Sequence, residues 1–298
     1  MNSINLFNKT LRYKDYDCSK TLSAYDSRPP LFNLYLQVTD VCNAKCSFCD
    51  KANCISSDVE LDKDKLMNIL KELTERNMLG KISLTGGEPL LRVERLNEIL
   101  EIIHLVNPLA YVSLNTNGSR LENFREIKRP EFIKEVDMSR HHYNELENNA
   151  VFGIRVANFK EIHDFLSQNE HIILKLNCVM TKNQISTIHD VERYLEELAT
   201  YGIKEVRFIS LLNLTEGYED LFLDVKPLIE QFKKHTNIGS LYDKDICECF
   251  GFMYVASNGF PVTAFVRNTK KATCDYLRQL VYTPDNSLLD GFNGQIII

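Results

Sequence analysis

Short apolar runs alternate with amphipathic stretches along most of this 298-residue chain. The runs have the length of β-strands and cover residues 34–39, 81–85, 111–114, 133–138, 171–179 and 206–209. Between the first and second of these runs, Leu66, Ile69, Leu70 and Leu73 recur at the three- and four-residue intervals of a buried helix face. Asp62 precedes them and is suited to cap that helix.

The later amphipathic stretches repeat this arrangement. Helix periodicity recurs at Leu96, Ile99, Leu100 and Ile103, near residues 159–166, at Ile188, Val191, Leu195 and Leu198, and near residues 225–234. Strands that alternate with helices form parallel sheets covered by helices. Six such units are too few for a closed eightfold barrel, so we predict an α/β fold with a partial (β/α)6 TIM-like barrel and a small C-terminal hairpin extension. Functional groups of such sheets gather at the carboxyl ends of the strands.

The chain divides into three parts by composition. Residues 1–30 are polar, lack sustained periodicity and are predicted to form an N-terminal lead-in. Residues 31–235 hold the strands and helices of the barrel, and residues 236–298 form the C-terminal extension. Within the extension, Asn258 and Gly259 separate two apolar runs and predict a hairpin turn.

Composition and charge narrow the classes of function. With 44% hydrophobic residues the chain can bury a full core, and its net charge of -6 gives no basic field for a nucleic acid polymer. The absence of an apolar run of membrane-spanning length predicts no membrane association and a cytoplasmic location. Nine cysteines in such a chain are expected to be metal ligands or buried thiols rather than disulfides. Cys178 lies inside a strand pattern and is predicted to be a core residue.

Three cysteines share one short loop directly after the first strand. Cys42, Cys46 and Cys49 have the spacing C-x3-C-x2-C, with an aromatic residue before the last one. Soft thiolate ligands favour iron–sulfur clusters or zinc. A structural zinc site would need a fourth ligand, for which Cys54 or Asp50 is near in sequence. Because zinc cysteines usually come as two separated pairs, the spacing favours iron and sulfur.

A second motif closes the second predicted strand. Gly86, Gly87, Glu88 and Pro89 follow the strand at once. Two glycines let the backbone approach a ligand with no side chain in the way. Taken alone, the segment would be interpreted as a plain tight turn.

Together the two motifs resemble the signature of the radical S-adenosylmethionine (radical SAM) enzymes. The resemblance implies that the three thiolates bind three irons of a [4Fe-4S] cluster and that the fourth iron is left for SAM. The backbone of residues 86–89 would hold the SAM amino group. The resemblance further implies an oxidoreductase or lyase that cleaves SAM to a 5'-deoxyadenosyl radical, abstracts hydrogen from a substrate, and takes electrons from reduced flavodoxin or ferredoxin.

A finer resemblance extends over about residues 31–212. The runs VTDVCNAKCSFC, ISLTGGEPLLR, SLNTNG, KLNCVM and VRFIS resemble, in order, the strand ends of the subgroup that contains GTP 3',8-cyclase and its SPASM/twitch relatives. The resemblance implies that Phe48 packs near the adenine and that Ser139 and Asn177 contact the ribose or the carboxylate of SAM.

The chain departs from the cyclase at basic positions that contact the triphosphate there. Tyr35 and Ser83 stand at two of these positions, and Lys175 remains as a candidate catalytic residue. Since counter-charges for a triphosphate are lost, GTP is not the expected substrate.

The segment after the fourth strand is unusual. Arg140, His141 and His142 follow Ser139, in a run that resembles the layout at the same strand of viperin-like nucleotide enzymes. A surface pair of histidines usually has no function, but at this strand end one of the two is expected to bind substrate or move a proton. Arg140 is expected to pair with a substrate or SAM carboxylate.

Three further cysteines surround the C-terminal hairpin. Cys247, Cys249 and Cys274 resemble the ligands of a twitch-type auxiliary domain and imply a second iron–sulfur cluster. Ala264 and Phe265 stand where relatives commonly place another cysteine. The alternative is a hairpin lid with incidental or zinc-binding thiols.

These observations leave three hypotheses for function. The first is an enzyme that modifies a peptide, as in the maturation of ribosomally made peptide products, and it is suggested by the auxiliary cluster. No peptide-docking domain is recognised ahead of the barrel, since residues 1–30 are too short for one. The second is radical modification of a nucleotide or another small metabolite. The third is a zinc-binding structural module without catalysis.

Overall fold

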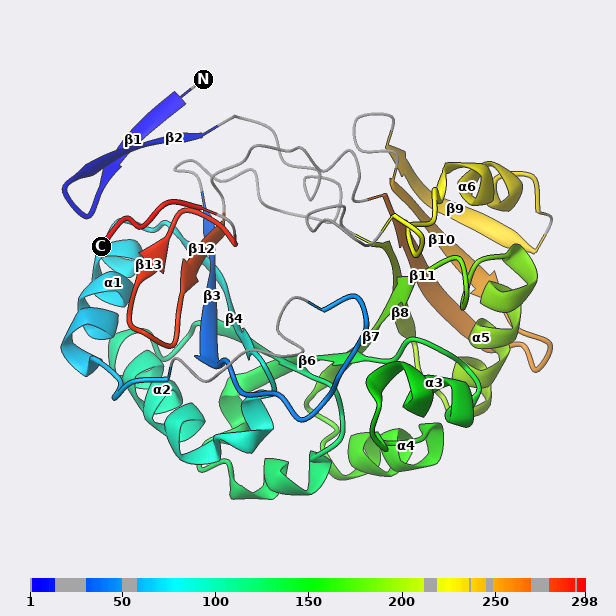
Figure 1. Cartoon of the computed structure of the whole chain (residues 1–298), viewed down its shortest axis with the longest axis horizontal. Coiled ribbons are helices and arrows are strands. Elements are labelled where there is room, and N and C mark those ends of the chain that lie inside the picture. Colours follow the sequence, from blue (N-terminus) through cyan, green and yellow to red (C-terminus); the bar gives the residue numbers. More distant parts are fainter. Residues whose placement is uncertain are drawn as a thin grey trace.

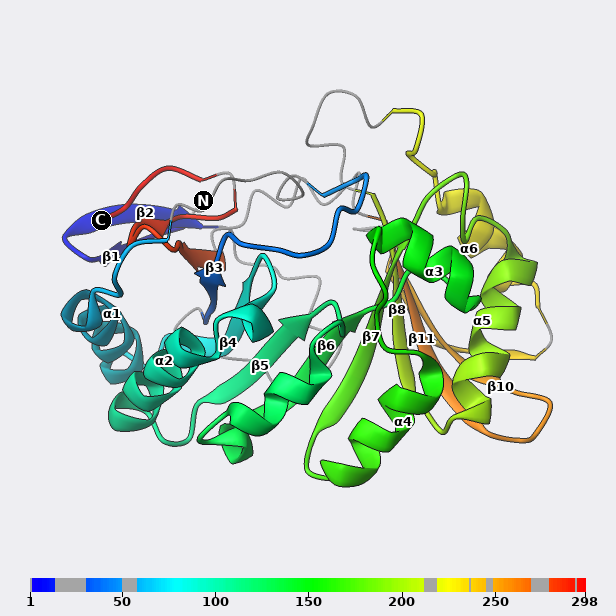
Figure 2. The ribbon, with the colours of Figure 1, turned by 60° about the horizontal axis from the view of Figure 1, so that its bottom comes forward.

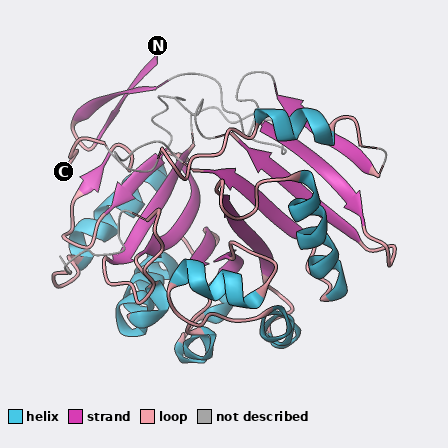
Figure 3. Ribbon diagram, turned by 45° about the vertical axis from the view of Figure 1, so that its right-hand side comes forward, coloured by secondary structure: helices cyan, strands magenta, loops and turns pink. Residues whose placement is uncertain are grey.

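The computed structural model describes residues 2–13, 31–49, 58–211, 219–235, 237–244, 249–268, 279–292 and 294–298. Its main feature is a curved sheet with its helices on the outer, convex side, which together make an open barrel (Figures 1 and 3). The predicted α/β fold with a partial TIM-like barrel is therefore confirmed.

Six parallel strands form the middle of the sheet. In spatial order they are β3 (Phe32–Thr39), β4 (Leu79–Gly86), β5 (Tyr111–Thr116), β6 (Ile133–Ser139), β7 (Ile173–Met180) and β8 (Glu205–Ser210). The described helices are α1 (Lys63–Glu75), α2 (Val93–Val106), α3 (Glu145–Phe152), α4 (Phe159–Gln168), α5 (Ile188–Thr200) and α6 (Lys226–Phe232). Short 3-10 turns occupy η2 (Pro89–Leu91), η3 (Leu121–Glu126) and η4 (Pro130–Phe132).

Strands from the C-terminal part extend the sheet at both edges. At one edge β12 (Gln279–Tyr282) runs parallel to β3 and carries β13 (Leu288–Leu289). At the other edge β11 (Pro261–Arg267) runs parallel to β8, followed by β10 (Cys249–Val255) and β9 (Ile238–Lys244) (Figure 1). The hairpin turn predicted at Gly259 joins β10 to β11. The three-part division stays a prediction; residues 14–30 of the lead-in lie outside the described residues.

A separate two-stranded sheet stands near the N-terminus. It pairs β1 (Asn2–Leu6) with β2 (Lys9–Tyr13) and was not predicted, because five-residue polar strands give a weak local signal.

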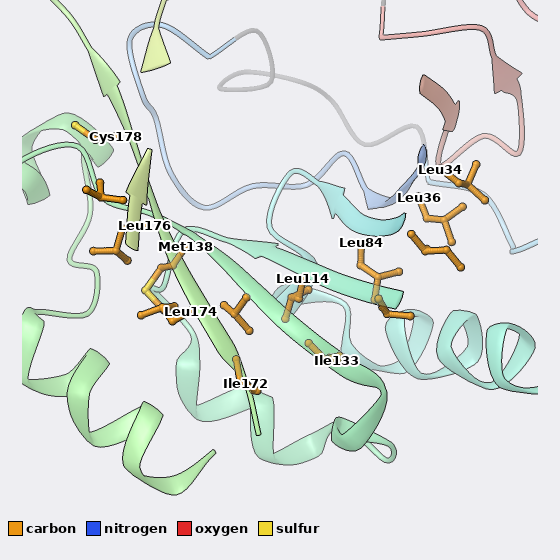
Figure 4. Packing of buried hydrophobic residues seen from close by; sticks show 14 of the residues in the cluster. Leu34, Leu36, Leu84, Leu114, Ile133, Met138, Ile172, Leu174, Leu176 and Cys178 are labelled. Atoms are coloured by element: carbon orange, nitrogen blue, oxygen red, sulfur yellow. The ribbon is translucent and has the colours of Figure 1, made fainter. Parts of the chain in front are cut away.

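The core lies between the sheet and the helices. Leu34 and Leu36 of β3 are fully buried in it, and Figure 4 shows them in one layer with apolar side chains of the neighbouring strands. Helix α1 adds the four residues that its periodicity predicted, and Asp62 caps it by accepting a hydrogen bond from the Lys65 amide. Alternate residues such as Tyr35 lie on the opposite, inner face of the sheet. The inner face is therefore free to carry polar groups.

Among the described residues, none of the helices combines the length and the apolar character needed to cross a bilayer.

The burial of α1 predicts the effect of a core truncation. Leu70 is 1% exposed, whereas Leu109 is 92% exposed. We expect Leu70→Ala to lower the free energy of unfolding by about 2–5 kcal/mol, because the substitution leaves a cavity. The matched Leu109→Ala change should stay within about 0.5 kcal/mol. Urea unfolding of both variants measures the difference, and equal losses would contradict the packing.

Candidate cofactor and active site

Four chain segments meet at the carboxyl ends of adjacent strands. The cysteine loop (residues 40–49) follows β3, the glycine segment (residues 86–89) follows β4, and two further segments follow β5 and β6. Figure 2 shows the cysteine loop crossing from the end of β3 toward α3. The candidate site is therefore built on the edge of the sheet that the sequence predicted.

The glycine segment is bonded directly to the start of the cysteine loop. The amide of Gly87 donates to the Thr39 carbonyl at 2.7 Å, and the amide of Glu88 donates to the Val41 carbonyl at 2.9 Å. A Cβ on Gly86 would lie 2.3 Å from the Thr39 carbonyl oxygen, and one on Gly87 would lie 2.2 Å from that of Val41. Gly86 also has a φ of +126°. The glycines are thus required first by the contact between two chain segments, a reason that the sequence did not reveal.

Glu88 joins the glycine segment to the segment after β5. Its buried carboxylate accepts hydrogen bonds from the Thr116 hydroxyl at 2.8 Å and from the amides of Asn117 at 2.6 Å and Leu90 at 3.1 Å. Burial raises the pKa of Glu88 to about 7. Pro89, also buried, begins η2. The carboxylate therefore fixes the backbone of η2 and of the segment after β5.

Asn117 connects this arrangement to a cysteine. Its Oδ1 accepts from the amide of Ser119 at 2.8 Å, and its Nδ2 donates to Oδ1 of Asn43 at 3.1 Å. The same Nδ2 lies 3.8 Å from Sγ of Cys42. Asn117 lies within the run SLNTNG, and no role for it was predicted from the sequence. Its place at the carboxyl end of a parallel strand was the available signal.

The three cysteines of the loop are soft ligands with perturbed thiols. Burial, together with the thiols of Cys49 and Cys42, raises the pKa of Cys46 to about 12, and burial also raises the pKa of Cys42. Three thiolates in this loop therefore need cations between them. In the part of the chain that the structure describes, no three His, Cys, Asp or Glu side chains converge on one metal ion. Three soft thiolate ligands in one short loop suit a [4Fe-4S] cluster, in which each thiolate binds a different iron.

Both residues considered as a fourth zinc ligand, Cys54 and Asp50, lie outside the described residues.

The cysteine loop has a small apolar core of its own. Ala44 and Cys46 pack with Phe152 and Val156, apart from the main core. The amide of Lys45 also donates to the Phe152 carbonyl at 2.8 Å. Helix α3, which supplies Phe152, was not predicted. The loop is thus held from β3 at one end and from α3 at the other.

His141 lies behind the cysteine loop. Its buried ring stacks on Phe152 with centroids 4.8 Å apart and meets Phe48 edge to face at 5.0 Å. Its Nδ1 accepts from the amide of Val179 at 3.2 Å. Burial and the charge of Arg140 lower the pKa of His141 to about 3. The ring is therefore neutral near pH 7, which suits the positioning of Phe48 better than proton transfer.

The two sequence neighbours of His141 make contacts with other residues. Half-buried His142 accepts at Nδ1 from the amide of Asn144, 2.9 Å away. Arg140 is 2% exposed; its Nη1 donates to the Ala157 carbonyl at 2.9 Å and its guanidinium lies 3.9 Å from the centre of the Phe159 ring. These contacts place Arg140 within the protein interior. Its Nε is buried without a hydrogen-bond partner in the described part of the chain and is the donor left for a ligand carboxylate.

Ser139, the last residue of β6, is the register partner of Asn177 within β7. Among the described residues, Oδ1 of Asn177 and Oε1 of Gln37 are buried with no hydrogen-bond partner. Buried polar atoms are normally paired, so these two atoms are suited to receive ligand donors. Gln37 was not singled out from the sequence, although its alternation with Leu36 placed it on the inner face.

Deeper on the inner face, charged side chains form one ion network. Its members are three cations and three carboxylates: Lys81, Lys175, Arg207, Glu135, Asp137 and Glu205. Lys175 lies 2.7 Å from Glu135, and Arg207 lies 2.8 Å from Asp137. Although burial opposes ionisation, Lys81 and Lys175 hold the pKa of Glu135 well below its usual range. Lys175 is thus already neutralised by carboxylates.

The second set of cysteines is described only in part. Cys249 begins β10 and is half-buried. Cys247 and Cys274 lie outside the described residues, so the second cluster stays a prediction.

The contacts of Glu88 predict what its removal does. In Glu88→Ala the buried amides of Asn117 and Leu90 lose their acceptor, at a cost of about 1–3 kcal/mol for each donor left unsatisfied. We expect a lower free energy of unfolding in urea and weaker iron retention by the cysteine loop. The exposed Glu75 provides the control, since Glu75→Ala should change neither quantity. An unaltered Glu88→Ala variant would contradict the assigned contacts.

Comparisons with known proteins agree with this geometry. The model of the Radical SAM superfamily matches residues 36–184, which is half of the chain. The probable GTP 3',8-cyclase of Methanothermobacter marburgensis is 32% identical over 114 residues, 38% of this chain and 36% of that protein. The GTP 3',8-cyclase of Aquifex aeolicus is 24% identical over 256 residues, 84% of this chain and 79% of that protein.

A solved structure shares the fold. Streptococcus suis SuiB bound to the precursor peptide SuiA has a TM-score of 0.64 at 16% identity, over 90% of this chain and 62% of SuiB. This chain spans less than two thirds of the length of SuiB and of the Methanothermobacter protein. Because the family model covers half of the chain, including the cysteine loop and the glycine segment, the chain belongs to the radical SAM superfamily.

Proposed function

We propose that this chain is a radical SAM enzyme in which Cys42, Cys46 and Cys49 hold three irons of a [4Fe-4S] cluster and leave the fourth iron to SAM. The observation that carries the proposal is the direct backbone bonding between the glycine segment and the start of the cysteine loop. It keeps the two halves of the family signature side by side. When bound, the cluster supplies one electron to the SAM sulfonium, whose C5'–S bond breaks to give methionine and a 5'-deoxyadenosyl radical.

The residues around the signature would bind and orient SAM. In this proposal residues 86–89 receive the amino group, and Ser139 and Asn177 receive the ribose or the carboxylate. The unpartnered Oδ1 of Asn177 supports this, because a ligand hydroxyl would satisfy it. Phe48 would pack near the adenine, and its edge-to-face contact with His141 limits its freedom to turn. Reduced flavodoxin or ferredoxin is the proposed electron donor.

For the substrate we propose a peptide. The ion network on the inner face supports this choice, since Lys81, Lys175 and Arg207 are each paired with carboxylates. A triphosphate would find no unpaired cation among these three. SuiB, which shares the fold, was solved with a precursor peptide bound. The second cluster proposed at Cys247, Cys249 and Cys274 would also suit a maturation enzyme of the SPASM/twitch type.

A nucleotide or another small metabolite is the second candidate. It is favoured by the sequence relatives, which include GTP 3',8-cyclases.

The assignment of the cluster ligands predicts a selective loss of iron. We expect Cys42→Ala to hold no stable [4Fe-4S] cluster in the cysteine loop after anaerobic reconstitution and to cleave no SAM, because one iron loses its ligand. Cys178→Ala is the matched control, since Cys178 is a fully buried thiol of β7 that is not part of the loop. Iron and sulfide analysis measures the result, as about four irons fewer than in the control. Retention of SAM cleavage by Cys42→Ala would refute the assignment.

The proposed substrate class predicts where hydrogen is taken from. The reduced enzyme is incubated with SAM and, separately, with deuterated GTP or with deuterated short peptides encoded beside its gene. We expect deuterium in 5'-deoxyadenosine with a peptide and none with GTP, because the inner-face cations are already neutralised. Mass spectrometry of the 5'-deoxyadenosine reads the outcome. Transfer from GTP alone would establish the nucleotide alternative.

A further inference from the structure

The amide of Asn117 has one orientation that satisfies its neighbours. Its Oδ1 accepts from the Ser119 amide at 2.8 Å, and reversing the group would set two donors against each other. Nδ2 therefore points to the cysteine loop, where one N–H goes to Oδ1 of Asn43 at 3.1 Å. The other N–H is left for Sγ of Cys42, 3.8 Å away. Asn117 is 8% exposed, so water competes little for this donor.

Two N–H groups face the sulfur of Cys42. The amide of Ala44 lies 3.4 Å from Sγ, within the loop itself, and the Asn117 side chain approaches from another strand. Hydrogen bonds to cluster sulfurs stabilise the more negative, reduced state and so raise the reduction potential. The donor from Asn117 is the one that a substitution can remove.

Asn117 is also held by the glycine segment. Its backbone amide donates to Oε2 of Glu88 at 2.6 Å, and the preceding Thr116 hydroxyl donates to Oε1 at 2.8 Å. The side chain therefore cannot drift away from Cys42 without breaking buried hydrogen bonds. One residue thus touches both the proposed seat of SAM and a proposed ligand of the cluster.

We propose that Asn117 is a positioning residue that raises the reduction potential of the cluster through its hydrogen bond to Cys42. This inference rests on the proposed function, because it requires a cluster at Cys42. The electron that enters from flavodoxin or ferredoxin is the one later passed to SAM. A donor beside Cys42 makes that electron easier to accept.

The test is a redox titration of the full chain, reconstituted anaerobically and followed by electron paramagnetic resonance without SAM. Asn117→Ala removes the donor. We expect a more negative potential, with the ratio of reduced to oxidised cluster at the wild-type midpoint falling about threefold to tenfold, the effect of one lost hydrogen bond. Asn117→Asp keeps an acceptor for the Ser119 amide but turns an oxygen toward Sγ, so its shift should be at least as large.

Asn123→Ala is the matched control. Asn123 donates to the Leu90 carbonyl at 2.9 Å, and its loss should leave the potential unchanged. Wild-type potentials in both Asn117 variants at full iron content would overturn the inference. So would loss of iron from both variants but not from Asn123→Ala, since Asn117 would then only support the loop. If the wild-type chain itself binds no cluster, the proposed function fails first, and iron analysis distinguishes the two failures.

Discussion

The site depends on the contact between the ends of β3 and β4. Two backbone hydrogen bonds join residues 87 and 88 to residues 39 and 41, at a separation that a Cβ on Gly86 or Gly87 would not permit. The cysteine loop leaves β3 at this junction, so its direction is set there. A side chain at either glycine would push the loop and the strand apart, and the three thiols would move with the loop.

Hydrogen bonds of buried polar groups then connect this junction to the segments that follow the neighbouring strands. Glu88 reaches the segment after β5, and Asn117 reaches the cysteine loop from that segment. After β6, Oδ1 of the fully buried Asn148 accepts from the amides of His141 and His142. Such networks add little net stability but are costly to break in part, so they select one arrangement of the loops. The aromatic contacts of His141 and the small core around Phe152 complete that selection.

The parts of this architecture with a local signal were predictable from sequence. Helix α1 has the apolar face and the Asp62 cap that its sequence predicts. The cysteine and glycine motifs lie at strand ends, as their positions in the sequence indicate. Helix α3 was not predictable, because its buried face includes Asn148, whose burial depends on hydrogen bonds to residues outside the helix. Likewise, β12 pairs with β3 across more than two hundred residues, and no local periodicity encodes that pairing. The role of Asn117 arises from contacts among three separate segments.

The charges on the inner face of the sheet bear on which kind of ligand can bind there. Glu135 and Asp137 lie almost fully buried on β6, and their charges are compensated by Lys81, Lys175 and Arg207. Removing a cation from this network to serve a ligand would weaken the compensation of the buried carboxylates, and breaking a buried ion pair outright costs about 3–5 kcal/mol. A ligand with several negative charges would have to meet that cost repeatedly. A group without net charge does not meet this cost, and this difference is the reason for proposing the uncharged backbone of a peptide, rather than a polyphosphate, as the ligand at the floor of the barrel.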